Sequence, residues 1–577
     1  MKKKVFRSGL ISLMMAIILV ISACSGGGGN KEQQTNNNNN GTAPTETNAG
    51  NASSDDKFNP VGEFPIAKEQ ITLKMFAPQY ASIENMETNL FTKWVEEKTN
   101  IKLQWDLAPD SALNDRKNLM LASGDYPEVI WNGSLTKEEQ MKYGAQGVFI
   151  PLNDLIDKYA PNVKKAMEDI PYLKGSITAP DGNIYAIPQV NECYHCDNAL
   201  KLWINKAWLD KLEMDIPTTT EEFFEVMKAF KEKDPNGNNK QDEIPLTGSD
   251  EMWVGNVSAF LMNSFILDDY TEKNKGTFLR VIDEKVDFVA DKDEWRQGLE
   301  YLNKLYAEGL IDPAAFTQNA DAIQQLANRE GENIMGGLTT ALLSYAYPMN
   351  DSTPRHKDYV VVPPLKGPNG VQQTLFFGGI TNSQFAITNK ATPEQQIAAI
   401  RLVDLMFTEE AITLQEHGPE GTGWRKAEEG ELNINGEQAK YALIVDPNPP
   451  PTHNNGWEQI GPSLRTYEYR NSFAELEQDP LAPGGYGMRL HEASKLYEPF
   501  HSDNQYPNGV FIALEDAEMA AQIQITLVDY VKSNMAQFIT GSKNIEKDWD
   551  GYVKGFEGMQ LSQYLDIYQR AYDNAKQ

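Results

Sequence analysis

Strands and helices alternate at the start of the folded part of this chain, and that order constrains the fold more than any other feature. The short stretches at 71–76, 101–107 and 128–131 are predicted to be strands. Amphipathic stretches at 89–98 and 113–121 lie between them and are typical of helices. Because a strand-helix-strand order places successive strands parallel, the sequence predicts an α/β fold with mostly parallel sheets.

The length of the chain predicts two lobes. About 520 of the 577 residues follow residue 56, which is too many for one hydrophobic core. A further helix is expected after Thr218, which would cap it with Glu221 three residues on. The remaining expected strands are 203–205, 359–363 and 384–388, and the remaining expected helices are 295–310, 393–407, 514–533 and 561–575.

The first 56 residues are typical of an exported lipoprotein. Four basic residues precede an apolar run at 10–21, and small residues lead to Cys24, so residues 1–23 are predicted to be a signal peptide. Lipidation of Cys24 would anchor the protein on the outer face of the cytoplasmic membrane, whereas an ordinary signal peptide with an incidental cysteine is the alternative. Residues 24–56 are polar and of low complexity, so we expect a disordered tether, of a kind typical of Gram-positive bacteria.

The charge and the motifs limit the class of function. The chain has 52 basic and 82 acidic residues and a net charge of −30, which makes nucleic acid a poor partner. The sequence contains no G-x-S-x-G, H-E-x-x-H or phosphate-binding G-x-x-x-x-G-K motif, so we expect a protein that is not an enzyme. A calcium-dependent surface polysaccharide hydrolase or lyase, using two of the many carboxylates, remains the alternative.

Residues 234–243 form a turn-rich segment with oxygen-bearing side chains at alternating positions. Asp234, Asn236 and Asn238 occupy positions 1, 3 and 5, and an EF-hand loop uses these positions for Ca²⁺. The segment departs from an EF-hand, because position 6 is Asn239 instead of glycine and position 12 is Pro245 instead of glutamate. The predicted ligands are Asp234, Asn236, Asn238, the carbonyl of Lys240, Asp242 and Glu243, and a solvated turn is the alternative.

Cys193 and Cys196 form a C-x-x-C pair with Tyr194 and His195 between them. In an oxidising compartment, this spacing favours a local structural disulfide. A redox pair or a metal site remains open, although a thioredoxin-like motif would begin a helix, and this one is expected in a loop after 185–188.

Seven short sequence segments occur in a characteristic order and spacing, at residues 124–127, 151–155, 181–188, 202–206, 234–245, 308–310 and 363–368. Together they resemble the family 1 extracellular solute-binding proteins of ABC importers. The likeness runs from about residue 67 to the C-terminus and is strongest to a long lipoprotein branch that includes binders of alginate oligosaccharides.

The resemblance implies a two-lobed periplasmic-binding-protein-like fold of type II, with a ligand cleft between hinged lobes. The first lobe would hold 57–190 and 381–465, and the second 191–380 and 466–577 with the calcium loop and the C-terminal helices. The family's calcium ligands match all six positions predicted above, and the resemblance gives Ca²⁺ a structural role.

The resemblance also implies a function. It indicates a lipid-anchored monomer that captures an oligosaccharide and delivers it to the permease subunits of an ABC importer. A ligand sensor for a membrane kinase is the alternative within the same fold.

Sugar sites combine aromatic rings, which stack on C–H faces, with polar side chains that bind hydroxyl groups. Residues of both kinds follow expected strands or lie in glycine-rich loops. The predicted ligand-binding residues are Tyr80, Trp131, Asn132, Tyr194, Trp253, Trp424 and Trp457, with Glu192 and Arg425 as weaker candidates. Trp94, Trp105, Trp203 and Trp208 lie within regular elements and are expected in the core.

Overall fold

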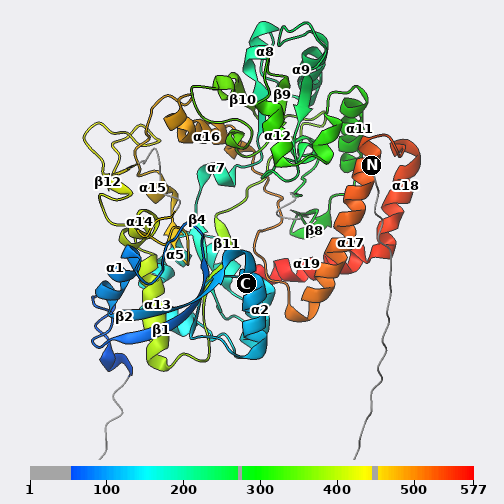
Figure 1. The fold of residues 1–577 in the computed structure, drawn as a ribbon. Coiled ribbons are helices and arrows are strands. Elements are labelled where there is room, and N and C mark those ends of the chain that lie inside the picture. Colours follow the sequence, from blue (N-terminus) through cyan, green and yellow to red (C-terminus); the bar gives the residue numbers. More distant parts are fainter. Residues whose placement is uncertain (1–53, 271–275, 445–451, 577) are drawn as a thin grey trace, which may run out of the picture. The chain divides into compact units, whose positions relative to one another are not determined.

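The structure is a computed structural model and describes residues 54–270, 276–444 and 452–576. Two mixed β-sheets organise these residues (Figure 1). The expected tether, the signal peptide and Cys24 lie outside them, apart from the last residues of the tether. Ser54–Lys57 forms the 3₁₀ helix η1, so these residues belong to the body.

The first sheet has six strands in the order β14-β4-β11-β3-β1-β2. β1 pairs in parallel with β2 and β3, β14 pairs in parallel with β4, and β11 is antiparallel to both β3 and β4. The strands are β1 Ile71–Gln79, β2 Ile101–Pro109, β3 Val129–Leu135, β4 Ile187–Asn191, β11 Ile380–Ile387 and β14 Leu464–Arg465.

The second sheet has four strands in the order β10-β5-β9-β6. Only the β6–β9 pair is parallel among the described strands of this sheet, so the expectation of mostly parallel sheets is correct for the first sheet and wrong for the second. These strands are β5 Leu202–Asn205, β6 Ile244–Thr247, β9 Met335–Thr339 and β10 Tyr359–Val362, and two hairpins pair β7 Leu279–Ile282 with β8 Lys285–Phe288 and β12 Trp424–Lys426 with β13 Tyr441–Leu443.

Helices pack around both sheets. Those close in sequence to the first sheet are α1 Leu90–Thr99, α2 Leu113–Ser123, α3 Lys137–Ala145, α4 Asn153–Tyr159, α5 Pro161–Asp169, α6 Leu173–Ile177, α13 Pro393–Met406 and α14 Glu409–His417. Those close in sequence to the second are α8 Lys206–Lys211, α9 Thr220–Glu232, α10 Val257–Met262, α11 Asp293–Ala307 and α12 Ala320–Ala327. The C-terminal region adds α16 Tyr486–Lys495, α17 Leu514–Ile539, α18 Ile545–Gly555 and α19 Leu561–Ala575. Figure 1 shows α17 and α18 near α11, and α19 packs against α17.

The local sequence explains where these helices begin. Thr136, Thr219 and Thr392 each form a capping box with a Glu or Gln three residues later. The cap of α9 is therefore Thr219 with Glu222, one residue beyond the predicted pair, because it is Thr219 whose side chain accepts the N–H of Glu222. Trp203 and Trp208 are buried as expected, whereas Trp94 and Trp105 are half-buried.

Three clusters of buried side chains make the core. Two clusters lie on the first sheet, one containing Leu73 and Ile387 and the other containing Phe76 and Ala386. Since neighbouring residues of a strand point to opposite faces, these two clusters occupy opposite faces of that sheet. The third cluster surrounds the second sheet and includes residues of the C-terminal helices, such as Leu527. The body thus has two sheet-centred cores, and the lobe boundaries drawn from the sequence stay a prediction.

Candidate functional site

In the described residues, the chain passes between the two sheets three times. The first crossing joins β4 to β5, the second joins β10 to β11, and the third leaves β14 toward α16, which packs in the core of the second sheet. Two short helices lie in these crossings, α7 Tyr194–Asp197 in the first and α15 Tyr467–Arg470 in the third. Because several short segments connect two independent cores, this region has the construction of a hinge.

The crossings are tied together at α7. The hydroxyl of Tyr467 donates to the carboxylate of Asp197 at 2.6 Å, and the backbone N–H of Phe377 donates to the carbonyl of Asp197 at 3.1 Å. The N–H of Tyr467 also donates to the Glu192 carboxylate at 3.1 Å. Asp197 therefore contacts both other crossings. Neither Asp197 nor Tyr467 was singled out from the sequence, because only the fold brings residues 270 positions apart together.

A disulfide closes α7. Cys193 and Cys196 are paired, with their Cα atoms 5.1 Å apart, and the N–H groups of Cys196 and Asp197 donate to the carbonyl of Cys193. The motif thus lies in a one-turn helix after a strand, where the sequence had predicted a loop. The hydroxyl of Tyr194, inside the closed turn, donates to Glu498 at 2.7 Å.

Burial controls the charges at the hinge. Burial raises the pKa of Asp197 to about 6; the hydrogen bond from Tyr467 lowers it, and the neighbouring Glu192 raises it. Burial also raises the pKa of Glu192. Lys201 is fully buried, donates to the carbonyls of His195 and Asn198, and has a pKa that burial lowers to about 7.

A second group of side chains lies at the end of β1 and in the middle of β3. The sequence predicted that this strand ends at residue 131, but β3 continues to Leu135, so Asn132 lies within it. Tyr80 directly follows β1, and its hydroxyl accepts from the amide of Asn132 at 3.2 Å. The amide oxygen of Asn132 accepts the N–H of Gly461 at 2.8 Å. Asn132 has a left-handed backbone at φ +58°, which asparagine tolerates better than most residues, so β3 turns here. The structure thus brings together two of the predicted ligand-binding residues.

Trp131 and Trp457 lie in the core beneath this group. Both side chains are fully buried, and their rings meet edge to face with centroids 5.9 Å apart. The Trp131 ring packs against Phe385 and the Trp457 ring against Phe91. In this structure neither ring presents a face to a ligand, so both predicted stacking residues are found in a supporting position. The sequence pattern misled because Gly461 passes so close to the Trp131 ring that a Cβ atom built there would overlap the indole nitrogen.

Trp253 is half-buried and follows β6 of the second sheet. Its carbonyl accepts the N–H of Ala341, two residues beyond β9, at 3.0 Å. Because β6 and β9 are parallel, Trp253 lies at their carboxyl ends, where α/β sheets bind ligands.

Trp424 lies away from Tyr80 and Trp253, at a surface cavity of about 530 Å³. Leu90, Trp94 and Tyr441 also line this cavity. The indole N–H of Trp424 donates to the carbonyl of Gly418 at 2.8 Å, and its ring meets Tyr441 edge to face. Arg425 forms a bidentate ion pair with Glu431, which occupies its guanidinium group.

The loop at 234–243 follows α9 and leads into β6. Asp234 accepts the N–H groups of Gly237, Asn238 and Asn239, and Asn239 adopts the left-handed backbone (φ +59°) that the sequence required of position 6. Asp242 accepts from the amides of Asn236 and Asn238.

Glu243 is the unusual member of this loop. Both of its carboxylate oxygens are buried and have no hydrogen-bond partner in the described structure. Burial raises its pKa, and the nearby Asp234 and Asp242 raise it further. A buried carboxylate without a partner is unfavourable, and a cation with oxygen ligands would satisfy it.

Comparison with known proteins assigns the family. Residues 80–413, more than half of the chain, match the model for bacterial extracellular solute-binding proteins. The chain belongs to that family. The fructooligosaccharide ABC transporter substrate-binding protein FusA of Streptococcus pneumoniae is 29% identical over 520 residues, which cover 88% of this chain and 91% of FusA. Lipoprotein LipO of Bacillus subtilis is 25% identical over 61% of this chain and 67% of its own length.

Solved structures of solute-binding proteins share the fold. FusA, as an EF-hand mutant in complex with fructo-nystose, matches with a TM-score of 0.66 and 27% identity over 88% of this chain and 99% of that chain. Alginate-binding protein AlgQ2 without calcium ion matches in fold, with a TM-score of 0.58 and 24% identity over 88% of this chain and 99% of that chain. The α/β fold is therefore that of a type II periplasmic binding protein, as the resemblance implied, and the family binds solutes rather than transforming them.

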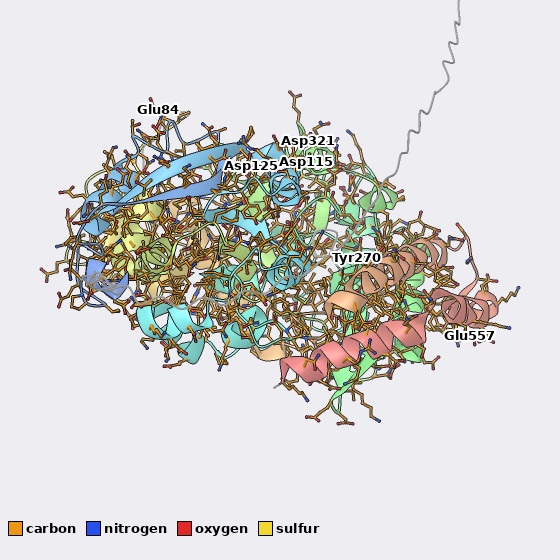
Figure 2. The ribbon with its side chains drawn as sticks, turned by 90° about the horizontal axis from the view of Figure 1, so that it is seen from below. Glu84, Asp115, Asp125, Tyr270, Asp321 and Glu557 are labelled. Atoms are coloured by element: carbon orange, nitrogen blue, oxygen red, sulfur yellow. A yellow bond between two sulfur atoms is a disulfide. The ribbon has the colours of Figure 1, made fainter. Side chains whose placement is uncertain are left out.

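The outer surface of this solute-binding protein is acidic. Figure 2 shows Glu84, Asp115, Asp125, Asp321 and Glu557 on the outside of the body, in agreement with their exposure and with the net charge of −30. Among the described residues, no helix is both long and apolar enough to cross a membrane.

The buried carboxylate of Asp197 makes the stability of the hinge depend on pH. Its folded-state pKa of about 6 exceeds the value of about 3.9 expected in an unfolded chain, so the folded state binds this proton more tightly. The free energy of unfolding should fall as the pH rises from about 4 through 6. Asp197→Asn removes this dependence, so the variant should gain about 2 kcal/mol relative to the wild type between pH 4.5 and 7.5, measured by urea unfolding.

Asp115→Asn, at an exposed aspartate, is the control and should follow the wild type. An Asp197→Asn profile parallel to that of the wild type would show that the hinge carboxylate titrates normally.

Proposed function

We propose that this protein captures an oligosaccharide outside the cell and delivers it to an ABC importer. The similarity to FusA, whose name describes a fructooligosaccharide-binding component of an ABC transporter, supports this most directly, because it spans nearly the whole of both chains. The two sheets joined by three crossings supply the machinery that such capture needs.

Ligand capture would use closure of the two lobes about the hinge. A ligand that contacts both lobes favours the closed form by the free energy of those additional contacts. The proposed contact residues are Tyr80 and Asn132 at the first sheet, Trp253 at the second and Tyr194 in the hinge. Trp131 and Trp457 would support this surface from beneath, by holding Asn132 and the loop at Gly461 in place.

The charges near Tyr80 favour a neutral sugar. Asp110 and Glu458 lie close enough to Tyr80 to raise the pKa of its hydroxyl, although burial is the larger cause. A uronate chain, such as an alginate oligosaccharide, would bring further negative charge to this acidic surface. We therefore propose a neutral oligosaccharide as the ligand.

Binding of kestose, a sugar that has been found in complex with FusA, tests this function by isothermal titration calorimetry. The wild type should bind kestose, and a galacturonate trimer should bind far more weakly. Trp253→Ala should raise the Kd for kestose about tenfold, which corresponds to ~1.4 kcal/mol, because a stacking ring is lost.

Trp424→Ala is the matched control, since this ring contacts Gly418 and Tyr441 at the separate cavity, and its Kd should stay within twofold of the wild type. A loss of affinity in Trp424→Ala without one in Trp253→Ala would place the sugar at that cavity instead. Release of new reducing ends from the sugar would instead support the hydrolase alternative.

We also propose that the loop at 234–243 binds Ca²⁺ as a structural ion. The side chains of Asp234, Asn236, Asn238, Asp242 and Glu243 and the carbonyl of Lys240 would hold it, and Glu243 would replace the missing ligand at position 12. The two unpartnered oxygens of Glu243 and the left-handed backbone of Asn239 fit this assignment, and FusA has itself been studied as an EF-hand mutant. Bound calcium would neutralise the cluster of carboxylates between α9 and β6 and stabilise the second lobe.

Calcium should therefore raise the melting temperature by a few degrees, because it binds the folded state only. Asp242→Ala should abolish that rise in a thermal-shift measurement. The control Glu251→Ala removes an exposed acid outside the loop and should keep the full response. An undiminished calcium response in Asp242→Ala would exclude the site.

The location that we propose is the outer face of the cytoplasmic membrane, with lipidated Cys24 as the anchor and residues 24–53 as the tether. The signal-like start of the sequence and the similarity to lipoprotein LipO support it. The permease subunits of the importer would then meet the ligand-loaded receptor at the membrane.

Cys24→Ser should release the protein into the soluble fraction of the cell culture, because two acyl chains are lost. Immunoblots of membrane and soluble fractions measure this, and Cys193→Ser should remain with the membrane. A Cys24→Ser variant that stays in the membrane fraction would argue against lipidation.

A further inference from the structure

Residues 507–513 lie between the cores of the two sheets; we call this segment the strap. It leads into α17, whose buried face belongs to the core of the second sheet. Val510 and Ile512 pack against that core, whereas Phe511 between them is 4% exposed and belongs to the cluster on the first sheet that contains Phe76 and Ala386. Phe511 therefore packs against a different core from its two neighbours.

Two helices of the first sheet hold the strap. Lys137, the first residue of α3, has its ammonium group 4.2 Å from the centre of the Phe511 ring. The same ammonium donates to the carbonyl of Ser176 in α6. Gly509 passes close to both: a Cβ atom built there would lie 3.4 Å from the Cβ of Ser176 and 3.9 Å from the Cε of Lys137. Phe511 is thus enclosed by residues of the first sheet's core and by the ammonium group of Lys137 above its ring, and burial lowers the pKa of that ammonium group to about 7.

The strap also begins beside the hinge. The side-chain amide of Asn508 donates to the carbonyls of Phe376 and Phe377 in the second crossing, at 3.3 and 3.1 Å. Phe377 in turn contacts Asp197 of the first crossing. Atoms near a hinge axis move least during closure, so a side chain anchored here can stay seated while the lobes rotate.

We propose that Phe511 is a positioning residue for ligand capture: it acts as a pivot that joins the C-terminal part of the chain to the first lobe and restricts the lobes to one closing motion. It adds a non-covalent connection to the three covalent crossings. Without it, the ligand-free protein would sample additional lobe arrangements, which binding must then remove, so affinity falls. This inference rests on the proposed capture of an oligosaccharide by lobe closure.

Calorimetric titration and stopped-flow kinetics with kestose test the pivot. Phe511→Ala should raise the Kd at least fivefold, mostly through faster dissociation, and Phe511→Leu should recover most of the loss. Lys137→Met, which removes both the ammonium group over the ring and its hydrogen bond to the Ser176 carbonyl, should raise the Kd two- to threefold and provides a readout if Phe511→Ala does not fold.

Phe149→Ala is the matched control. Phe149 is a fully buried aromatic residue of the same cluster, but it belongs to the first lobe alone. This variant should lose thermal stability and keep its Kd within twofold of the wild type. The pivot is overturned if Phe511→Ala binds as well as the wild type or more tightly, or if Phe149→Ala loses as much affinity.

Small-angle X-ray scattering of the ligand-free proteins separates this inference from the proposed function. Phe511→Ala should have a larger radius of gyration than both the wild type and Phe149→Ala, whatever sugar the protein binds. An unchanged radius would overturn the pivot. A wild type that fails to bind kestose would count against the proposed ligand and leave the scattering comparison as the test of the pivot.

Discussion

The contact between Asp197 and Tyr467 is the constraint on which the rest of this structure depends. It joins the first and third crossings, and the backbone of Asp197 joins the second, so three segments far apart in the chain meet at one short helix. The disulfide between Cys193 and Cys196 fixes that helix. A receptor that closes about a hinge needs lobes that move as rigid units and crossings that keep a fixed arrangement relative to one another. The hydrogen bonds of Asp197 hold the three crossings in that arrangement.

The ionisable groups at the hinge lower its stability but give it a defined arrangement. Asp197, Glu192 and Lys201 are held away from water, and burial shifts the pKa of each toward its neutral form. An apolar hinge of the same size would be more stable. The polar groups instead form directional hydrogen bonds, so they define one arrangement of the crossings. The loop at 234–243 joins α9 to β6 at a distance in sequence from any crossing, so the calcium that we propose there would have a separate, structural role.

The sequence was most informative where local patterns decide structure. Helix α19 spans the predicted residues 561–575, and Asn239 adopts the left-handed backbone that its position in the loop required. The cap of α9 was misplaced by one residue because Thr218 and Thr219 both precede an acidic pair, and only the geometry selects Thr219. Sheet direction was predicted less well, since β5, which follows the first crossing, lies antiparallel to both β9 and β10, and no local pattern reveals this.

The ligand site was the least predictable feature, because exposure depends on packing between distant segments. Tyr80 follows its strand as expected, whereas Asn132 lies within β3 instead of after it, although the two side chains do lie together. The equally plausible Trp131 and Trp457 fill the core beneath them. The measurement that tests lobe closure most directly is small-angle X-ray scattering of the wild type with and without saturating kestose. Closure about the hinge predicts a smaller radius of gyration in the complex. An unchanged radius, under conditions where calorimetry shows kestose to be bound, would contradict it.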